Sequence, residues 1–169
     1  MTEGDKALLA DIPMQMVAAW NRGDADAFAA PFTDTANFVG FEGTHLRGRE
    51  EIAAFHRQIF ATVVKGTDLE GGVRFVRLLA TDRAVIHSWV RYTNLPGVHP
   101  TTPGRDSMQL YVATKRAGQW SIDALQNSRQ LTLEQQELLD TIESLPDDAR
   151  RQLPDLLASL AAGKTAPTP

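Results

Sequence analysis

The 169-residue chain has no cysteine and no strong excess of charge of either sign. Without cysteine it can form no disulfide, no thiolate metal site and no thiol nucleophile. The 17 basic and 21 acidic side chains leave a net charge of −4, and no cluster of Lys or Arg marks a surface that would follow a phosphate backbone. We therefore expect no nucleic-acid partner.

Long hydrophobic runs and sorting signals are missing as well. No stretch of about 18 apolar residues occurs. The beginning, MTEGDKALLADI, lacks a basic segment followed by an apolar one. We expect no membrane partner and a cytoplasmic protein.

Signatures of cofactors and metals are equally scarce. The glycines of residues 42–50, EGTHLRGRE, match neither a dinucleotide fingerprint nor a phosphate-binding loop. His45 and His99 have no second histidine or carboxylate at a metal-binding spacing. We predict neither a cofactor nor a metal ion.

What is present is a helical pattern followed by an alternating one. Helices are predicted over residues 5–22 and 48–66, with a short helix after Asp24 and a strand over residues 36–41. From about residue 69 the period changes to two, which predicts four strands in two hairpins. We interpret residues 1–130 as one α+β domain, residues 131–162 as a helical C-terminal extension and residues 163–169 as a disordered tail.

Three stretches carry a family resemblance: FTDTANFVGFEG, LRGREEIAAFHRQIF and GQWSIDALQNSR. They resemble the SgcJ/EcaC family of the nuclear transport factor 2-like (SnoaL-like) superfamily. The resemblance implies a cone-shaped α+β fold, in which a curved mixed or antiparallel sheet wraps around the N-terminal helices. In such cones the concave face lines a ligand cavity and the convex face commonly meets a second subunit, so a homodimer is expected.

The superfamily contains cofactor-free enzymes alongside proteins that only bind or dimerise. Among the enzymes are SnoaL-type polyketide cyclases, limonene epoxide hydrolase, scytalone dehydratase and ketosteroid isomerase. In the first two, the resemblance places the catalytic Asp of the last strand at the position of Leu125. Because leucine is no acid, neither activity carries over to this chain.

The faces of the last strand depend on the turn KRAGQ. If Lys115 pairs with Gln119, Tyr111 lies opposite Asp123. One face of the hairpin is then polar and suits a cavity, and it carries Ser107, Gln109, Tyr111, Asp123, Leu125 and Asn127. The other face carries Trp120, Ile122 and Ala124 and suits packing.

His56 and Asp123 are the candidate catalytic residues. His56 shares the apolar face of its helix with Phe55, Ile59 and Phe60, where an imidazole can act as general acid or base. The alternative is a core histidine that only packs. Asp123 is either its carboxylate partner or an exposed strand residue.

Further polar and aromatic residues are candidates for contacting a ligand. His87 and Trp89 share one face of their strand and form either a stacking wall for a flat ligand or part of a subunit interface. The full set of candidate ligand contacts is Trp20, Asn37, Phe38, His87, Trp89, Gln109, Tyr111 and Asn127.

These residues favour a small cofactor-independent enzyme of the cyclase, isomerase or dehydratase type. Its substrate would be a hydrophobic, oxygenated, polyketide-like intermediate of bacterial secondary metabolism. One alternative is a protein of the same fold that binds or sequesters such a molecule. Another is a dimerisation module with a vestigial cavity. The C-terminal extension would form a lid, a dimer contact or a cover for an apolar patch.

Overall fold

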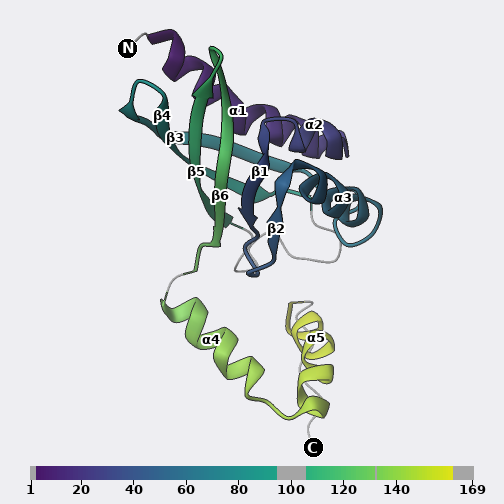
Figure 1. Cartoon of the computed structure of the whole chain (residues 1–169). Coiled ribbons are helices and arrows are strands. Elements are labelled where there is room, and N and C mark those ends of the chain that lie inside the picture. The colour runs from purple at the N-terminus through teal and green to yellow at the C-terminus, as the bar shows by residue number, and fades with distance from the viewer. Residues whose placement is uncertain (1–2, 95–105, 132, 162–169) are drawn as a thin grey trace, which may run out of the picture. The chain divides into compact units, whose positions relative to one another are not determined.

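The computed structural model describes residues 3–94, 106–131 and 133–161, and the chain divides into two compact units (Figure 1). In the first unit, residues 1–130, the described residues form an α+β domain of three helices and a six-stranded sheet. The second, residues 131–169, contains the helices α4 (Leu133–Glu143) and α5 (Asp147–Ala161). The predicted α+β class is confirmed, because the described residues of this unit form helices and one open, mixed sheet.

The helices of the first unit form at the predicted places, except that the helix predicted over residues 48–66 ends at Ala61. They are α1 (Glu3–Asn21), α2 (Ala25–Ala29) and α3 (Gly48–Ala61). Helix α2 begins after Asp24, whose carboxylate accepts a hydrogen bond from the Ala27 backbone N–H at 2.9 Å. Helix α1 packs against β3, and α3 packs against β1.

The sheet has the order β2-β1-β6-β5-β4-β3. Its strands are β1 (Phe32–Val39), β2 (His45–Arg47), β3 (Leu69–Ala80), β4 (Arg83–Tyr92), β5 (Asp106–Arg116) and β6 (Gln119–Arg129). Strand β1 runs parallel to β6, and all other neighbours are antiparallel. Both predicted hairpins, β3–β4 and β5–β6, are confirmed, whereas the short β2 was not predicted from the glycine-rich segment.

One face of the sheet, called the inner face here, is buried with the helices, and the opposite outer face is more exposed. The inner side chains of β4 alternate with half-buried outer ones, as the burial of Ile86 and Ser88 beside His87 shows. A continuous core joins α1, α2 and α3 to this face. It is rich in aromatic and large aliphatic side chains, which contribute most to burial of apolar surface.

The turn of the β5–β6 hairpin differs from the predicted one. Arg116 pairs with Gln119, so the turn has two central residues, Ala117 with φ 50° and Gly118 with φ 81°. Two positive φ angles in a two-residue loop define the type I′ turn, whose twist matches that of the flanking strands. The predicted pairing of Lys115 with Gln119 is wrong by one residue.

A β-bulge then changes which side chains of β6 face inward. Ala113 pairs with Ile122 but Val112 pairs with Ala124, which leaves Asp123 as the extra residue. Ile122 before the bulge and Leu125 after it are both buried in the core. The expected opposition of Tyr111 and Asp123 is therefore replaced by Tyr111 opposite Leu125, and the outward placement of Trp120 and Ile122 is wrong.

Candidate functional site

Three polar side chains lie side by side across the inner face. Gln109 in β5 is the register partner of both Ser88 in β4 and Asn127 in β6, and we call these three residues the polar row. The neighbouring row, around Tyr111 and Leu125, is apolar apart from one phenol group. Two predicted ligand contacts, Gln109 and Asn127, thus come together on adjacent strands, with Tyr111 beside them.

Hydrogen bonds fix the orientation of Gln109. Its Oε1 accepts from the Tyr111 hydroxyl at 2.6 Å and from the Ser88 hydroxyl at 3.1 Å. Burial raises the pKa of Tyr111 well above its usual value, so this hydroxyl keeps its proton and donates. Within the described residues, the amide Nε2 of Gln109 has no hydrogen-bond partner.

Asn127 also leaves hydrogen-bonding capacity unused. Its side-chain Oδ1 is one of three fully buried side-chain atoms without a partner in the described part of the chain, the others being Thr33 Oγ1 and Thr114 Oγ1. Unpaired polar atoms in an interior call for a partner, either water or a ligand.

Six rings on five elements form an aromatic cluster. The cluster consists of Trp20 from α1, Phe28 from α2, Phe38 from β1, His56 and Phe60 from α3 and Tyr92 from β4. Phe38 and Tyr92 belong to strands on either side of β5 and β6, which carry two residues of the polar row. The cluster and the polar row therefore share the interior of the first unit. Trp20 and Phe38, two of the candidate ligand contacts, are buried in it.

His56 lies at the centre of this cluster. Its ring stacks on Phe28 with centroids 4.1 Å apart and meets Phe38 edge-on at 5.3 Å. Nδ1 donates a hydrogen bond to the backbone carbonyl of Ile52, one helical turn earlier, at 2.7 Å. Because a carbonyl can only accept, the proton is on Nδ1 and the lone pair is on Nε2, which no described residue contacts by a hydrogen bond.

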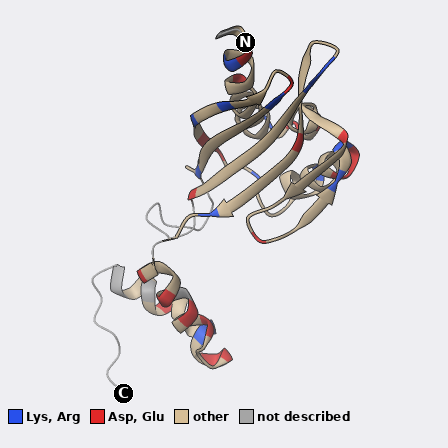
Figure 2. Cartoon of the chain, turned by 60° about the vertical axis from the view of Figure 1, so that its left-hand side comes forward, with Lys and Arg blue, Asp and Glu red and all other residues tan. Residues whose placement is uncertain are grey.

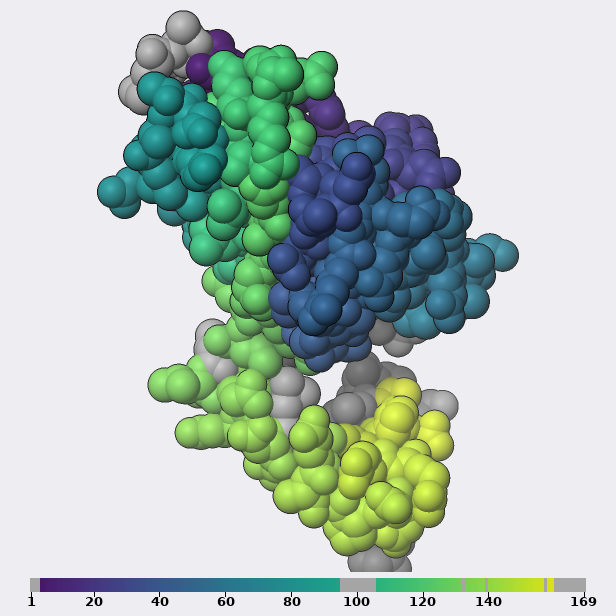
Figure 3. Space-filling model, viewed as in Figure 1, coloured from purple at the N-terminus to yellow at the C-terminus, as the bar shows by residue number. Residues whose placement is uncertain are grey.

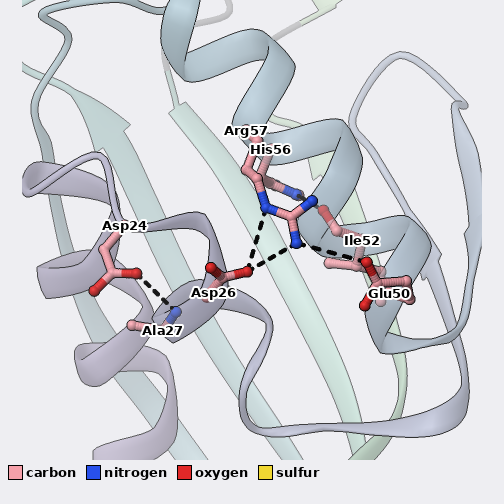
Figure 4. Close-up of polar contacts among 7 residues, drawn as sticks. All are labelled: Asp24, Asp26, Ala27, Glu50, Ile52, His56 and Arg57. Atoms are coloured by element: carbon pink, nitrogen blue, oxygen red, sulfur yellow. Dashed lines mark hydrogen bonds and ion pairs between the residues drawn. The ribbon is translucent and has the colours of Figure 1, made fainter.

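Burial governs the charge of His56. With 2% of its surface exposed, it has a pKa lowered to about 4, since desolvation outweighs the hydrogen bond to Ile52. The imidazole is therefore neutral at pH 7. Its neighbour Arg57 points away from the core and bonds Asp26 at 2.9 Å and Glu50 at 3.6 Å (Figure 4).

The predicted pairing of His56 with Asp123 is not formed. At the bulge, Asp123 faces Arg116, with Oδ1 and Nη2 3.5 Å apart. In the described part of the chain no hydrogen bond or ion pair links Asp123 to His56. The extra residue in β6 rotates Asp123 out of the inner row, so the carboxylate and the imidazole belong to different parts of the domain.

Three other candidate ligand contacts lie away from the interior. Asn37 is exposed on β1, where its Oδ1 bonds Nε2 of His45 at 3.0 Å. His87 and Trp89 occupy the outer face of β4, and His87 packs near Phe75 with ring centroids 5.0 Å apart. The structure therefore corrects the expectation that these three residues contact a ligand inside the cone.

The structure also adds residues that the sequence did not single out. Ser88, Phe28 and Tyr92 contact candidate residues directly. Ser88 has the parity of buried Ile86 and Val90 along β4, and this parity was the available signal. Tyr92 has the same parity, whereas Phe28 is brought to the cluster by helix packing, which periodicity alone does not encode.

The described residues contain neither a metal-binding cluster nor a membrane-spanning helix. No group of three or more His, Cys, Asp or Glu side chains there could hold a metal ion. None of the described helices combines the length and apolar character needed to cross a bilayer. His99, for which the sequence predicts no role as a metal ligand, lies outside the described residues.

Comparison with known proteins identifies the family. The model of the SnoaL-like domain matches residues 14–121. A Nostoc punctiforme domain of unknown function with a cystatin-like fold is 51% identical, with a TM-score of 0.82 over 96% of this chain and 99% of its own. No curated protein matches the sequence.

Two more distant structures share the fold. A ketosteroid isomerase-like protein from Erwinia carotovora atroseptica is 24% identical, with a TM-score of 0.65 over 78% of this chain and all of its own. A putative scytalone dehydratase from Novosphingobium aromaticivorans is 12% identical, with a TM-score of 0.58 over 74% of this chain and 83% of its own. With the family model covering most of the first unit, the chain belongs to the SnoaL-like domain family.

Proposed function

We propose that the first unit binds a small, flat, hydrophobic and oxygenated molecule between the aromatic cluster and the polar row. The observation that carries this proposal is His56, a neutral imidazole among five aromatic rings with an unused acceptor at Nε2. Such a group recognises a ligand hydroxyl, and the surrounding rings suit an aromatic or polyketide-like skeleton. We also propose that the chain is a member of the SgcJ/EcaC family and that its ligand is an intermediate of bacterial secondary metabolism.

Binding is favoured over catalysis by the state of the ionisable groups. Leu125 occupies the place where the resemblance puts a catalytic acid, and Asp123 is paired elsewhere. Taking up a proton would create an imidazolium in a desolvated aromatic surrounding, which the lowered pKa of His56 makes unfavourable. Neutral His56 is therefore better suited to accept a hydrogen bond than to keep a proton.

A second candidate function is cofactor-free acid–base chemistry. It is favoured by the Nε2 lone pair of His56, which the bond from Nδ1 to Ile52 holds in one tautomer. In this version Nε2 takes a proton from a carbon next to a ligand carbonyl, and the electron pair of the broken C–H bond moves to form an enolate. Isomerisation, dehydration and cyclisation all contain such a step.

Ligand binding can be tested by thermal unfolding with 1-naphthol, naphthalene and a panel of hydroxylated aromatic ketones. We expect 1-naphthol to raise the unfolding midpoint of the wild-type protein more than naphthalene does. His56→Phe, which keeps a ring but removes the acceptor, should abolish this preference, and His87→Phe on the outer face should retain it. If no member of the panel stabilises the wild type, the interior is filled by its own side chains and a dimerisation module is the better description.

Acid–base activity has its own readout. A ketone such as 1-acetylnaphthalene, dissolved in D₂O with the protein, exchanges its methyl protons for deuterium only if a base forms the enolate. Exchange accelerated by the wild type but not by His56→Phe would establish the second candidate. Binding without acceleration would leave the binding function alone.

The outer face supports a homodimer as the quaternary part of the proposal. Apolar side chains gather there on β3, β4 and β5, and Phe75, Leu110 and Val112 are 48%, 44% and 36% exposed. Strands β5 and β6, in green, lie open at the surface beside β1 and β2 in Figure 3. A second copy would remove this apolar surface from water. We also propose that the protein is cytoplasmic.

A further inference from the structure

We propose that Gln109 and Asn127 form a two-amide site for the carbonyl oxygen of an uncharged ligand. This inference rests on the binding site proposed above. Tyr111 and Ser88 act as positioning residues that hold Gln109 in its donating orientation. The class of ligand recognised at this point is a ketone, aldehyde or quinone, in preference to a carboxylate or a hydrocarbon of the same shape.

The orientation of Gln109 is the first step. Two hydroxyl groups, from Tyr111 and Ser88, donate to the same atom, Oε1. An amide is planar, so saturating its oxygen from two sides leaves the NH₂ group directed away from both hydroxyls. Gln109 is 8% exposed, and its Nε2 has no acceptor among the described residues. A ligand oxygen would supply the acceptor that this amide N–H lacks.

Asn127 provides a second donor at the same place. It lies directly opposite Gln109 in the β5–β6 ladder, where Cβ atoms of paired residues are about 5 Å apart. Its Oδ1 is sealed in the protein, and no described residue accepts a hydrogen bond from its Nδ2. Two NH₂ groups on paired strand positions can reach one oxygen atom, which has two lone pairs to receive them.

In the part of the chain that the structure describes, the groups named around this site carry no net charge. His56 is neutral, and the Tyr111 hydroxyl keeps its proton. Arg129, two residues beyond Asn127 along β6, faces the carboxylate of Glu42 at 3.5 Å and the ring of Phe41 at 4.9 Å. A carboxylate entering the interior would lose its hydration without gaining a free cation, whereas a carbonyl needs only the two amides.

A matched set of probes tests the ligand class: 1-acetylnaphthalene, 1-ethylnaphthalene and 1-naphthoate, titrated into the full chain by calorimetry. We expect the ketone to bind the wild type about tenfold more tightly than the hydrocarbon, the gain of one to two net hydrogen bonds. Gln109→Leu should bring this ratio close to one, and Tyr111→Phe should lower it several-fold. Gln126→Leu, one residue from Asn127 but on the exposed outer side, should leave the ratio unchanged.

A vibrational measurement separates donation from a change in packing. The infrared C=O stretch of 1-acetylnaphthalene should fall on binding to the wild type, because hydrogen bonds weaken the carbonyl bond. The shift should shrink in Asn127→Leu and vanish in the double variant Gln109→Leu/Asn127→Leu. The wild-type spectrum alone decides whether the bound carbonyl accepts hydrogen bonds, even if the double variant does not fold.

The outcomes are distinct. Equal affinity for ketone and hydrocarbon, or a bound C=O stretch like that in hexane, overturns the two-amide site while leaving small-molecule binding intact. Tighter binding of 1-naphthoate than of the ketone overturns it in favour of a cationic site. Binding of none of the three probes, together with no response in the wider panel, overturns the proposed function along with it.

Discussion

At residue scale, the chemistry of the interior is set by which groups can hold a charge there. Leu125, which lies on the inner face of β6 beside Tyr111, has no ionisable group. His56 has one, but burial among its aromatic neighbours makes the charged imidazolium unfavourable, and the hydrogen bond to Ile52 fixes the neutral tautomer. Tyr111 is held in its protonated form by burial. The interior is thus built from neutral donors and acceptors.

The depressed pKa of His56 predicts a dependence of stability on pH. The folded state binds the proton at about pH 4 and the unfolded chain at about 6.5, so the unfolded state takes up protons first as the pH falls. The free energy of unfolding should be unaffected by this group above about pH 6.5. It should then fall by about 3 kcal/mol as the pH drops toward 4, since each pKa unit corresponds to about 1.36 kcal/mol.

Urea unfolding of the wild type and His56→Phe at several pH values between 7 and 4 measures this effect. The difference between the two proteins cancels the titration of the carboxylates, which both share. His87→Gln, on the outer face, should keep the wild-type profile. Parallel profiles for the wild type and His56→Phe would show that the imidazole is hydrated in the folded state.

At element scale, the helices and hairpins were predictable because their signals are local. Apolar spacing marked α1 and α3, alternation marked β3 to β6, and Asp24 marked the start of α2. The faces of β6 were not predictable, because the turn of Ala117 and Gly118 and the bulge at Asp123 each shift the register by one residue. The two shifts together moved Asp123 out of the site while keeping Asn127 in it.

The β5–β6 turn predicts a stabilising substitution. Ala117 has φ 50°, a left-handed conformation that asparagine tolerates better than alanine. Ala117→Asn should raise the free energy of unfolding by roughly 0.5 to 1 kcal/mol, because Asn-Gly is the preferred pair for a type I′ turn. Gly118→Ala, which nothing obstructs within 4 Å, should lower it by about 1 kcal/mol through backbone strain alone. Chemical denaturation of both variants measures the two changes in the free energy of unfolding. Changes of the same sign in both variants would contradict the type I′ turn.

The start of α3 predicts a more damaging glycine substitution. Gly48 has φ 77°, and a Cβ there would lie 2.5 Å from the backbone oxygen of Asp34. Gly66 has a similar φ of 74° with nothing within 4 Å, so it isolates the cost of conformation from the cost of the clash. Gly66→Ala should cost about 1 kcal/mol and Gly48→Ala more than about 2 kcal/mol, because β1 and α3 must separate. Urea unfolding measures the loss of stability in each variant. Similar losses in the two variants would show that the positive φ angle, and not a clash with Asp34, accounts for the cost.

At the scale of the whole molecule, charge is divided unequally between the two units. Residues 1–130 contain 14 acidic and 14 basic side chains, whereas residues 131–169 contain 7 acidic and 3 basic ones, which accounts for the net −4. Figure 2 shows the predominance of Asp and Glu on α4 and α5. Two copies of the first unit, each without net charge, have no long-range repulsion to overcome when apolar surfaces meet.

This neutrality, together with the apolar outer face, predicts a dimer that depends on β5. Leu110→Lys/Val112→Lys places two ammonium groups on partly exposed positions of that face, which a monomer tolerates and an interface buries at high cost. Analytical ultracentrifugation should show a dimer for the wild type and a monomer for the double variant. Val63→Lys, at a position 81% exposed outside the sheet, is the control and should remain dimeric.

Because Leu110 and Val112 point away from the polar row, the monomeric variant should keep the wild-type preference for 1-acetylnaphthalene over 1-ethylnaphthalene. A wild type that sediments as a monomer would contradict the dimer, and a double variant that still dimerises would show that the dimer contact does not involve β5.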